Sequence, residues 1–224
     1  MEFYSIVAFF QKGGLFMYPI LLVFAVGIAI AFERWIQLNR VRSANHKIWN
    51  LLHPVLVKGD FDKVRQMVNK DKSSMARMLG MGLARQGAVR RREDIEIAME
   101  ESMMEIIPQL EKRTPYVALL SNIATLLGLL GTIMGLIQAF TAVANANPAE
   151  KADLLSTSIS VAMNTTAFGL MSAIPLLLFH AKLTSTTGQI VDSLEMASVR
   201  ALNTISDFNR RNFESESGVT EGSH

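Results

Sequence analysis

The sequence predicts an all-α membrane protein with three transmembrane helices and long cytoplasmic helical extensions. Three observations support this fold class. Half of the 224 residues are hydrophobic, and the mean hydropathy is positive. The apolar residues are concentrated in three uncharged blocks, and each block is too long for an ordinary core helix. The segments between the blocks have helical periodicity, and none of them has a convincing strand pattern.

The first apolar block covers residues 13–32. Its 20 uncharged residues would form a helix about 30 Å long, which matches the hydrocarbon core of a bilayer. The block ends at Glu33, Arg34 and Trp35 without a small-residue cleavage pattern, so we interpret it as an uncleaved anchor. Residues 1–12 precede it and are predicted to form a short periplasmic or interfacial helix.

Two further apolar blocks predict the remaining transmembrane helices. In the loop before them, Asp60 is expected to cap a short helix. Pro108 and Pro115 are expected to bend the long helix that enters the second block, without ending it. The predicted segments are a cytoplasmic helical region (33–113), the second transmembrane helix (114–144), a periplasmic turn (145–153), the third transmembrane helix (154–181), a cytoplasmic helix (182–213) and a disordered tail (214–224).

Lysine and arginine are distributed unequally along the chain. Of the 22 such residues, 16 lie between Glu33 and Arg113, and four follow the third apolar block. Loops rich in these residues remain in the cytoplasm. The N-terminus is therefore predicted to be periplasmic, and the C-terminus cytoplasmic.

The composition argues against several functional classes. The net charge is only +2, and the basic residues are not interleaved with aromatic ones, so nucleic acid is not an expected partner. The absence of cysteine excludes disulfides and thiolate metal sites. The four histidines lack ligand spacing, and no nucleophile, base and orienting group come together. We therefore expect no metal, no cofactor and no enzymatic activity.

Small residues recur at helical spacing in the second and third blocks. Glycine in a water-exposed helix costs about 1 kcal/mol relative to alanine, so its repetition needs a reason. In lipid, small residues let another helix approach closely. A plain dimer or bundle face is one alternative that the glycines leave open. We predict packing against a partner helix through Thr125, Gly128, Gly131, Gly135, Ala162, Gly169 and Ala173.

Hydroxyl groups accompany these small residues near the middle of the membrane. Thr132 is 16 residues from Tyr116 near the inner end of the second span, and Thr166 is 15 residues from Ala181 at the inner end of the third, so they lie at similar depth. A hydroxyl can donate and accept a hydrogen bond, or give an oxygen to a sodium ion. The predicted ion pathway consists of Thr132, Thr166, Thr165 and Asn164. The alternative is that each threonine bonds only to its own helix.

No Asp, Glu, Lys or Arg lies within the three predicted spans. Transport by proton relay normally needs an ionisable group in the membrane. If this subunit handles protons, the titrating carboxylate must therefore come from a second protein.

Three parts of the sequence resemble a known family. They are the glycine and threonine motif of residues 126–135, the segment of residues 166–175 that ends in Ala-Ile-Pro, and Glu33-Arg34 after the first span. These motifs are similar to those of the ExbB and TolQ branch of the MotA/TolQ/ExbB proton-channel family. By motif position, Thr132 and Thr166 correspond to the pore threonines of that family.

The resemblance implies a stator subunit of an ion-driven motor in a bacterial inner membrane. It implies a homopentamer around a central pore, with two single-span partners of the ExbD or TolR type that each bring one membrane aspartate. A TonB-like, TolA-like or motility protein would receive the force, and a proton would be the transported ion. The process that is energised stays open among iron-complex uptake, envelope maintenance, motility and secretion.

The sequence departs from the family pattern at two positions. Val161 stands where a Glu is common, and Thr125 stands where a Pro is common. Asn164 is an additional polar residue nearby, which keeps sodium as an alternative ion. A passive three-span scaffold that anchors a partner is the alternative function.

Overall fold

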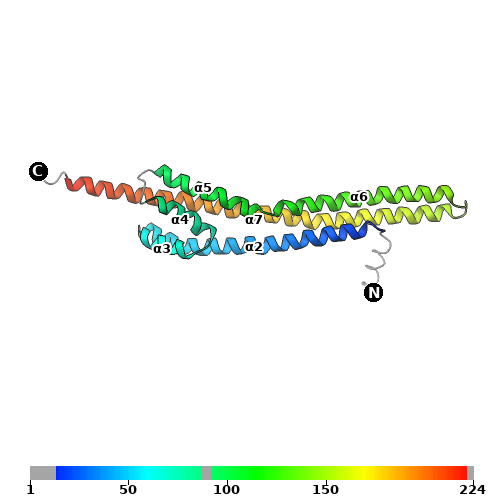
Figure 1. Ribbon diagram of the computed structural model, residues 1–224, viewed down its shortest axis with the longest axis horizontal. Coiled ribbons are helices and arrows are strands. Elements are labelled where there is room, and N and C mark those ends of the chain that lie inside the picture. Colours follow the sequence, from blue (N-terminus) through cyan, green and yellow to red (C-terminus); the bar gives the residue numbers. More distant parts are fainter. Residues whose placement is uncertain (1–13, 87–91, 221–224) are drawn as a thin grey trace. The chain divides into compact units, whose positions relative to one another are not determined.

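The computed structural model describes residues 14–86 and 92–220. The helix expected at residues 1–12 lies outside this range. The described part of the chain is all-helical, and three of its helical stretches are long and apolar enough to cross a membrane. The helices, shown in Figure 1, are α2 (Met17–Val57), α3 (Phe61–Lys70), α4 (Ser74–Gln86), α5 (Arg92–Glu111), α6 (Thr114–Asn145) and α7 (Lys151–Thr220).

The chain forms two compact units. Unit 1 comprises residues 1–35 and 113–184, and unit 2 comprises residues 36–112 and 185–224. Unit 1 therefore contains the three apolar blocks of the sequence, whereas unit 2 contains most of the charged residues. Helices α2 and α7 each contribute to both units.

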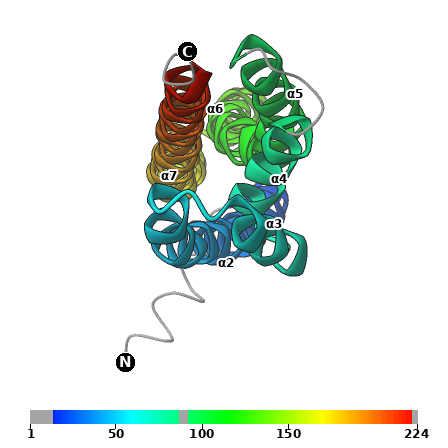
Figure 2. The same ribbon diagram turned by 90° about the vertical axis from the view of Figure 1, so that its left-hand side faces the viewer.

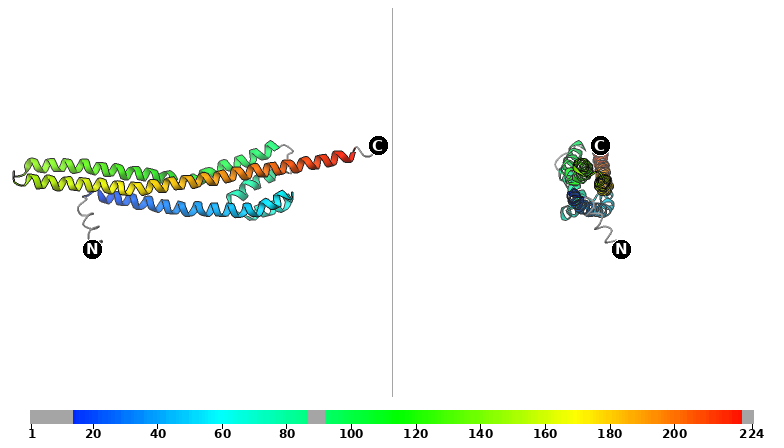
Figure 3. Two further views of the ribbon diagram at one scale, coloured as in Figure 1. Left: turned by 180° about the vertical axis from the view of Figure 1, so that it is seen from behind. Right: turned by 90° about the vertical axis from the view of Figure 1, so that its right-hand side faces the viewer.

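Unit 1 is built around an antiparallel hairpin of α6 and α7. A turn whose Glu150 N–H donates to the carbonyl of Asn147 at 3.0 Å connects the two helices, and they run side by side from this turn (Figures 1 and 3). A small apolar cluster at the core of unit 1 joins Ile20 of α2 to Ala124 of α6 and Ala173 of α7. Many large apolar side chains of α6 face outward, for example Leu126 and Phe140. An apolar exterior of this kind is what a lipid or a neighbouring subunit would cover.

The helix leading into the second span is broken at residues 112–113. Pro108 does not end it, as predicted, but the prediction that it continues through Pro115 is wrong. Helix α5 contains Pro108 and ends at Glu111, and α6 begins at Thr114 with Pro115 in its first turn. Arg113 between them has a left-handed backbone with φ 65°. In a continuous helix, the ring of Pro115 would clash with the carbonyl of Glu111, four residues earlier. In the first turn of a new helix, the missing N–H of proline costs nothing.

Unit 2 packs the remaining part of α2, α3, α4, α5 and the second part of α7 into a bundle, which Figure 2 shows from its end. Helix α3 is capped by Asp60, whose carboxylate accepts from the N–H of Lys63 at 3.2 Å, as predicted. Ser73 caps α4 in the same way through the N–H of Ala76. A second cap comes from α2, because the buried Asn45 accepts from the N–H of Met75 at 3.1 Å. These bonds fix where α3 and α4 begin.

Helix α7 is continuous from Lys151 to Thr220, with Pro175 in its interior. It thus includes the segments predicted as the third span and as a cytoplasmic helix, and it extends past residue 213, where a disordered tail was expected. In unit 2 its buried face carries Ile190, Leu194 and Ile205. Ser198 on the same helix donates to the Sδ of Met99 at 3.2 Å, which ties α7 to α5.

We predict that Asp60→Ala loosens the first turn of α3. Loss of a side-chain cap costs about 1 kcal/mol, so the amide of Lys63 should exchange with solvent about fivefold faster. Hydrogen exchange measured on the purified protein checks this. Asp60→Asn keeps an acceptor oxygen and should exchange like the parent. Equal exchange in both variants and the parent would contradict the cap.

Candidate functional site

Helices α6 and α7 approach each other backbone to backbone in unit 1. A Cβ added to Gly169 would lie 2.8 Å from the carbonyl oxygen of Ala124 and 2.9 Å from the Cα of Gly128. A Cβ added to Gly128 would lie 3.2 Å from the Cα of Gly169. Only glycine allows this distance, because the neighbouring atoms belong to the backbone and cannot turn aside.

Two further glycines of α6 extend the contact along α7. A Cβ on Gly135 would lie 2.8 Å from the Cβ of Ala162, and one on Gly131 would lie 2.3 Å from the Cγ2 of Thr165. The small-residue face of α6 is therefore covered by α7 of the same chain. The sequence instead predicts a partner helix at this face. In lipid, any helix with small residues at matching spacing satisfies that face, and α7 is the one that follows directly in the chain.

The hydroxyl groups of Thr132 and Thr166 meet at one edge of this contact. Their Oγ1 atoms are hydrogen-bonded to each other. Both also lie near the carbonyl oxygen of Gly128, to which Thr166 donates at 2.9 Å and Thr132 at 3.3 Å. The two hydroxyls have two protons for these three contacts, so only two of the three bonds are donated at once. Both side chains are half-buried, which leaves one side of the pair accessible.

The other predicted pathway residues lie around this pair. Thr165 is buried, and its hydroxyl donates to Val161 of its own helix at 2.9 Å. Asn164 is half-buried, but it is turned by about 200° from Thr166 because each residue of a helix turns by about 100°. The structure thus brings Thr132 and Thr166 together and places Asn164 on another side of α7.

Thr125 lies outside the contact between α6 and α7. It is exposed, and its hydroxyl donates to the carbonyl of Ser121 one turn earlier at 3.2 Å. Two residues, Ser121 and Ala124, occupy the buried face instead. Thr125 and Thr132 lie on the same edge of α6, since seven residues complete nearly two turns.

Ser121 is a polar contact that the sequence analysis missed. Its side chain is fully buried, and its hydroxyl donates to the carbonyl of Ala173 at 2.8 Å, which joins α6 to α7 toward their inner ends. Ser121 precedes Gly128 by seven residues, and Ala124 precedes it by four. Extending the small-residue spacing backward from Gly128 would have indicated both positions.

A charged cluster lies where α6 begins. The Nη1 of Arg113 contacts both carboxylate oxygens of Glu33, at 2.6 and 2.9 Å. Arg34 is 2% exposed, and it lies beyond the predicted span of residues 13–32. Burial lowers the pKa of the Arg34 guanidinium, the Glu33 carboxylate raises it, and Arg113 lowers it. The pKa of arginine is so high that Arg34 stays charged.

The described residues contain no group of three or more His, Cys, Asp or Glu side chains arranged to hold a metal ion. The chemistry at the centre of unit 1 is therefore that of hydroxyls and backbone carbonyls. Such oxygens can bind water, a carboxyl group or a hard cation.

Comparisons with known proteins agree with the motifs of this site. The family described as the MotA/TolQ/ExbB proton channel family matches residues 70–196, which is 127 of the 224 residues. The match covers α4, α5, α6 and the part of α7 that holds Thr166.

Individual relatives point the same way. The ExbB-like biopolymer transport protein 3 of Synechocystis sp. is 31% identical over 177 residues, which cover 75% of this chain and 80% of the relative. A protein named as an ExbB homolog from Methanothermobacter thermautotrophicus is 24% identical over 196 residues, or 87% of this chain and 68% of the relative. The Tol-Pal system protein TolQ of Haemophilus influenzae is 34% identical over 86 residues, or 38% of this chain and 37% of that protein.

We predict that Gly169→Ala separates α6 from α7. The added methyl would meet backbone atoms at 2.8 and 2.9 Å, and overpacking of this kind costs about 1–3 kcal/mol. Thermal unfolding of the protein in detergent should show a lower Tm.

Gly188→Ala is the matched control on the same helix. A Cβ at Gly188 meets nothing within 4 Å, so this variant should be as stable as the parent, or more stable by up to about 1 kcal/mol. If the two alanine variants unfold at the same temperature, the close contact at Gly169 does not hold the hairpin.

Proposed function

The chain belongs to the MotA/TolQ/ExbB proton channel family, and we propose that it is the channel-forming stator subunit of an ion-driven energy-transducing complex. The family consists of transport proteins and not of enzymes. The observation that carries the proposal is the contact between the hydroxyls of Thr132 and Thr166. The two apolar segments that hold them, residues 114–144 and 154–181, contain no carboxylate.

The proposal needs an acid from a second protein. A hydroxyl pair can accept or donate a hydrogen bond, but it does not titrate at physiological pH. A single-span partner of the ExbD or TolR type would bring one membrane aspartate to the accessible edge of the α6–α7 hairpin, where Thr125, Thr132 and Thr166 lie. The hydroxyls would then orient the carboxyl group and the water that exchanges its proton.

The assembly that we propose is a homopentamer of this chain around two such partner helices. It lies in the inner membrane of a bacterium, with the N-terminus in the periplasm and the C-terminus in the cytoplasm, as the distribution of lysine and arginine predicts. The outward apolar side chains of α6 and α7 would contact lipid and neighbouring copies. Ion flow would move the partner helices against the pentamer, and a TonB-like, TolA-like or motility protein would receive the force. By analogy with the relatives named for biopolymer transport, the work would be transport across the envelope.

The proton is the ion that we propose, because a partner aspartate and two hydroxyls suffice for proton exchange. Sodium is the second candidate. The carbonyl oxygen of Gly128 and the hydroxyl oxygens of Thr132 and Thr166 converge, and oxygens of this kind also suit a hard cation. Activity measured with and without sodium at constant proton gradient would distinguish the two ions.

We predict that Thr132→Val and Thr166→Val each abolish the driven process while the complex still assembles. Valine keeps the shape of threonine and removes the hydroxyl that contacts the partner carboxyl. Proton uptake into vesicles that contain the purified complex with its partner is the measurement, and native mass determination verifies assembly.

Thr141→Val serves as the control, because the hydroxyl of Thr141 is exposed and donates only to Ile137 of its own helix at 2.9 Å. This variant should transport like the parent. Normal proton uptake in both Thr132→Val and Thr166→Val would refute the role of the pair. Gly131→Leu should instead prevent assembly, because its side chain would overlap Thr165.

A further inference from the structure

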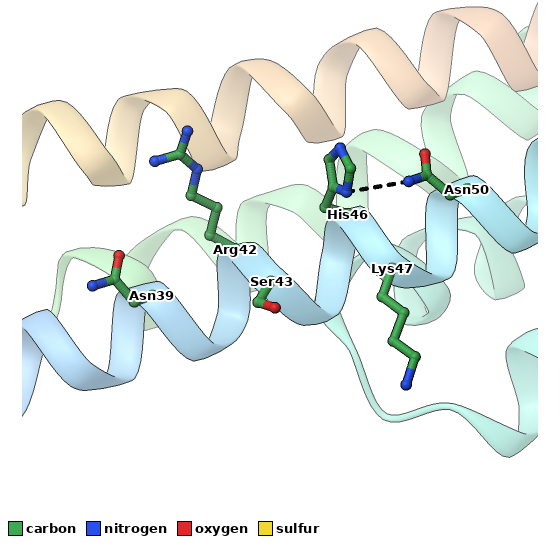
Figure 4. Close-up of a pocket in the computed structure, with 6 residues that line it drawn as sticks. All are labelled: Asn39, Arg42, Ser43, His46, Lys47 and Asn50. Atoms are coloured by element: carbon green, nitrogen blue, oxygen red, sulfur yellow. Dashed lines mark hydrogen bonds between the residues drawn. The ribbon is translucent and has the colours of Figure 1, made fainter.

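Helix α2 carries a basic hollow in unit 2. It has a volume of about 500 Å³ and is lined by Asn39, Arg42, Ser43, His46, Lys47 and Asn50, which we call the α2 hollow. Figure 4 shows Arg42 and His46 extending toward the neighbouring helix α7, whereas Lys47 extends away from it. The side-chain amide of Asn50 hydrogen-bonds to the Nδ1 of His46 at 3.2 Å. Among the ion pairs of the described residues, none involves Arg42 or Lys47.

A lipid headgroup fits this hollow poorly. Ile36 is the last large apolar side chain exposed on α2 before the hollow. At 1.5 Å per residue, Lys47 and Asn50 lie about 16 and 21 Å beyond it. The headgroup layer on one side of a bilayer is only about 5–8 Å thick. Most of the hollow therefore lies too far from the membrane for a headgroup to fill it, and an acidic protein surface is the better match.

Helix α5 of the same unit presents such a surface. Glu93, Glu96 and Glu100 are exposed at spacings of three and four residues, so they share one side of the helix. Ile97 and Met104 beside them are 59% and 73% exposed. Within the described residues, the ion pair that α5 forms is that of Glu105 with Arg77, on its other edge. The α5 face thus combines free acidic groups with exposed apolar ones.

The two surfaces lie at matching depth. Helix α5 ends at Glu111. Along the helix, Glu100 lies about 16 Å and Glu96 about 22 Å from this end. These values match the depths of Lys47 and Asn50 along α2. Ile36 and Glu111 both lie at the ends of the predicted cytoplasmic region. Copies arranged around an axis along the membrane normal must meet at equal depth, and a head-to-tail ring joins two different surfaces of each copy.

We propose that the α2 hollow of one copy receives the α5 face of the next copy, through Lys47 on one side and Glu100 on the other. This inference rests on the proposed assembly and names the surfaces that join its subunits. The exposed apolar residues Ile97 and Met104 would be covered in the same contact. In Figure 2, α2 and α5 lie on different sides of the end view of unit 2, so one copy can use both surfaces at once.

Engineered disulfides test the contact directly, because the chain has no cysteine. Ser43 and Met104 lie at about the same depth, each one turn from a proposed ion-pair partner. A variant with Ser43→Cys and Met104→Cys, oxidised mildly in membranes with the partner protein present, should yield a ladder of linked copies on a non-reducing gel. Each single variant should yield no ladder, because a head-to-tail contact needs both cysteines.

Ala44→Cys with Met104→Cys is the matched control. Ala44 is exposed, and it lies next to Ser43 but outside the α2 hollow. This pair should not link. The proposal is overturned if the control links as well as the test pair, or if the test pair stays unlinked while native mass shows several copies in the complex. A native mass of one copy would instead overturn the proposed assembly and the contact together.

Charge reversal provides a second readout. Lys47→Glu should lower the linked fraction by about two- to fivefold, because the ion pair with Glu100 is lost. Adding Glu100→Lys to the same chain should restore it. If charge reversal on either surface leaves the linked fraction unchanged, the charges do not join the copies.

Discussion

The close approach of α6 and α7 at Gly128 and Gly169 is the contact on which unit 1 depends. Lipid tails are as apolar as leucine, so no hydrophobic force drives these helices together, and packing must do it. The two glycines let backbone meet backbone, which places the hydroxyls of Thr132 and Thr166 within hydrogen-bond distance. A methyl group at either glycine would separate the helices and with them the two hydroxyls. The polar pair is thus positioned by the smallest residues of the hairpin.

Hydrophobic periodicity and uncharged length predicted the elements well. Three stretches without charge become three long apolar helices, and Asp60 begins α3 because its carboxylate satisfies an N–H that the helix cannot. Equal depth in two spans predicted that Thr132 and Thr166 are neighbours, and the structure brings them together. These features follow from local chemistry or from a simple count along a helix.

The sequence predicted most of the buried face of α6, since Gly128, Gly131 and Gly135 lie on it, but it placed Thr125 there instead of Ala124. Thr125 and Ala124 are adjacent, so their side chains differ by about 100° around the helix, and both were compatible with the small-residue spacing. In a soluble helix, hydrophobicity would select the inner face. In lipid both faces are apolar, so that signal is lost. The break at Lys112 and Arg113 escaped prediction for another reason, because a proline is compatible with both a kink and the first turn of a new helix.

The carbonyl oxygen of Gly128 affects how the hydroxyls of Thr132 and Thr166 would respond to the charge of a partner's carboxyl group. It accepts from Thr166 at 2.9 Å and lies 3.3 Å from Thr132, so the pair shares two protons among three contacts. An ionised carboxylate only accepts hydrogen bonds, and it would take one of these protons away from the pair. A neutral carboxyl group could donate its own proton and leave both internal bonds in place. The hydroxyls would then adopt one of two hydrogen-bond arrangements according to the charge beside them, without any movement of the helices.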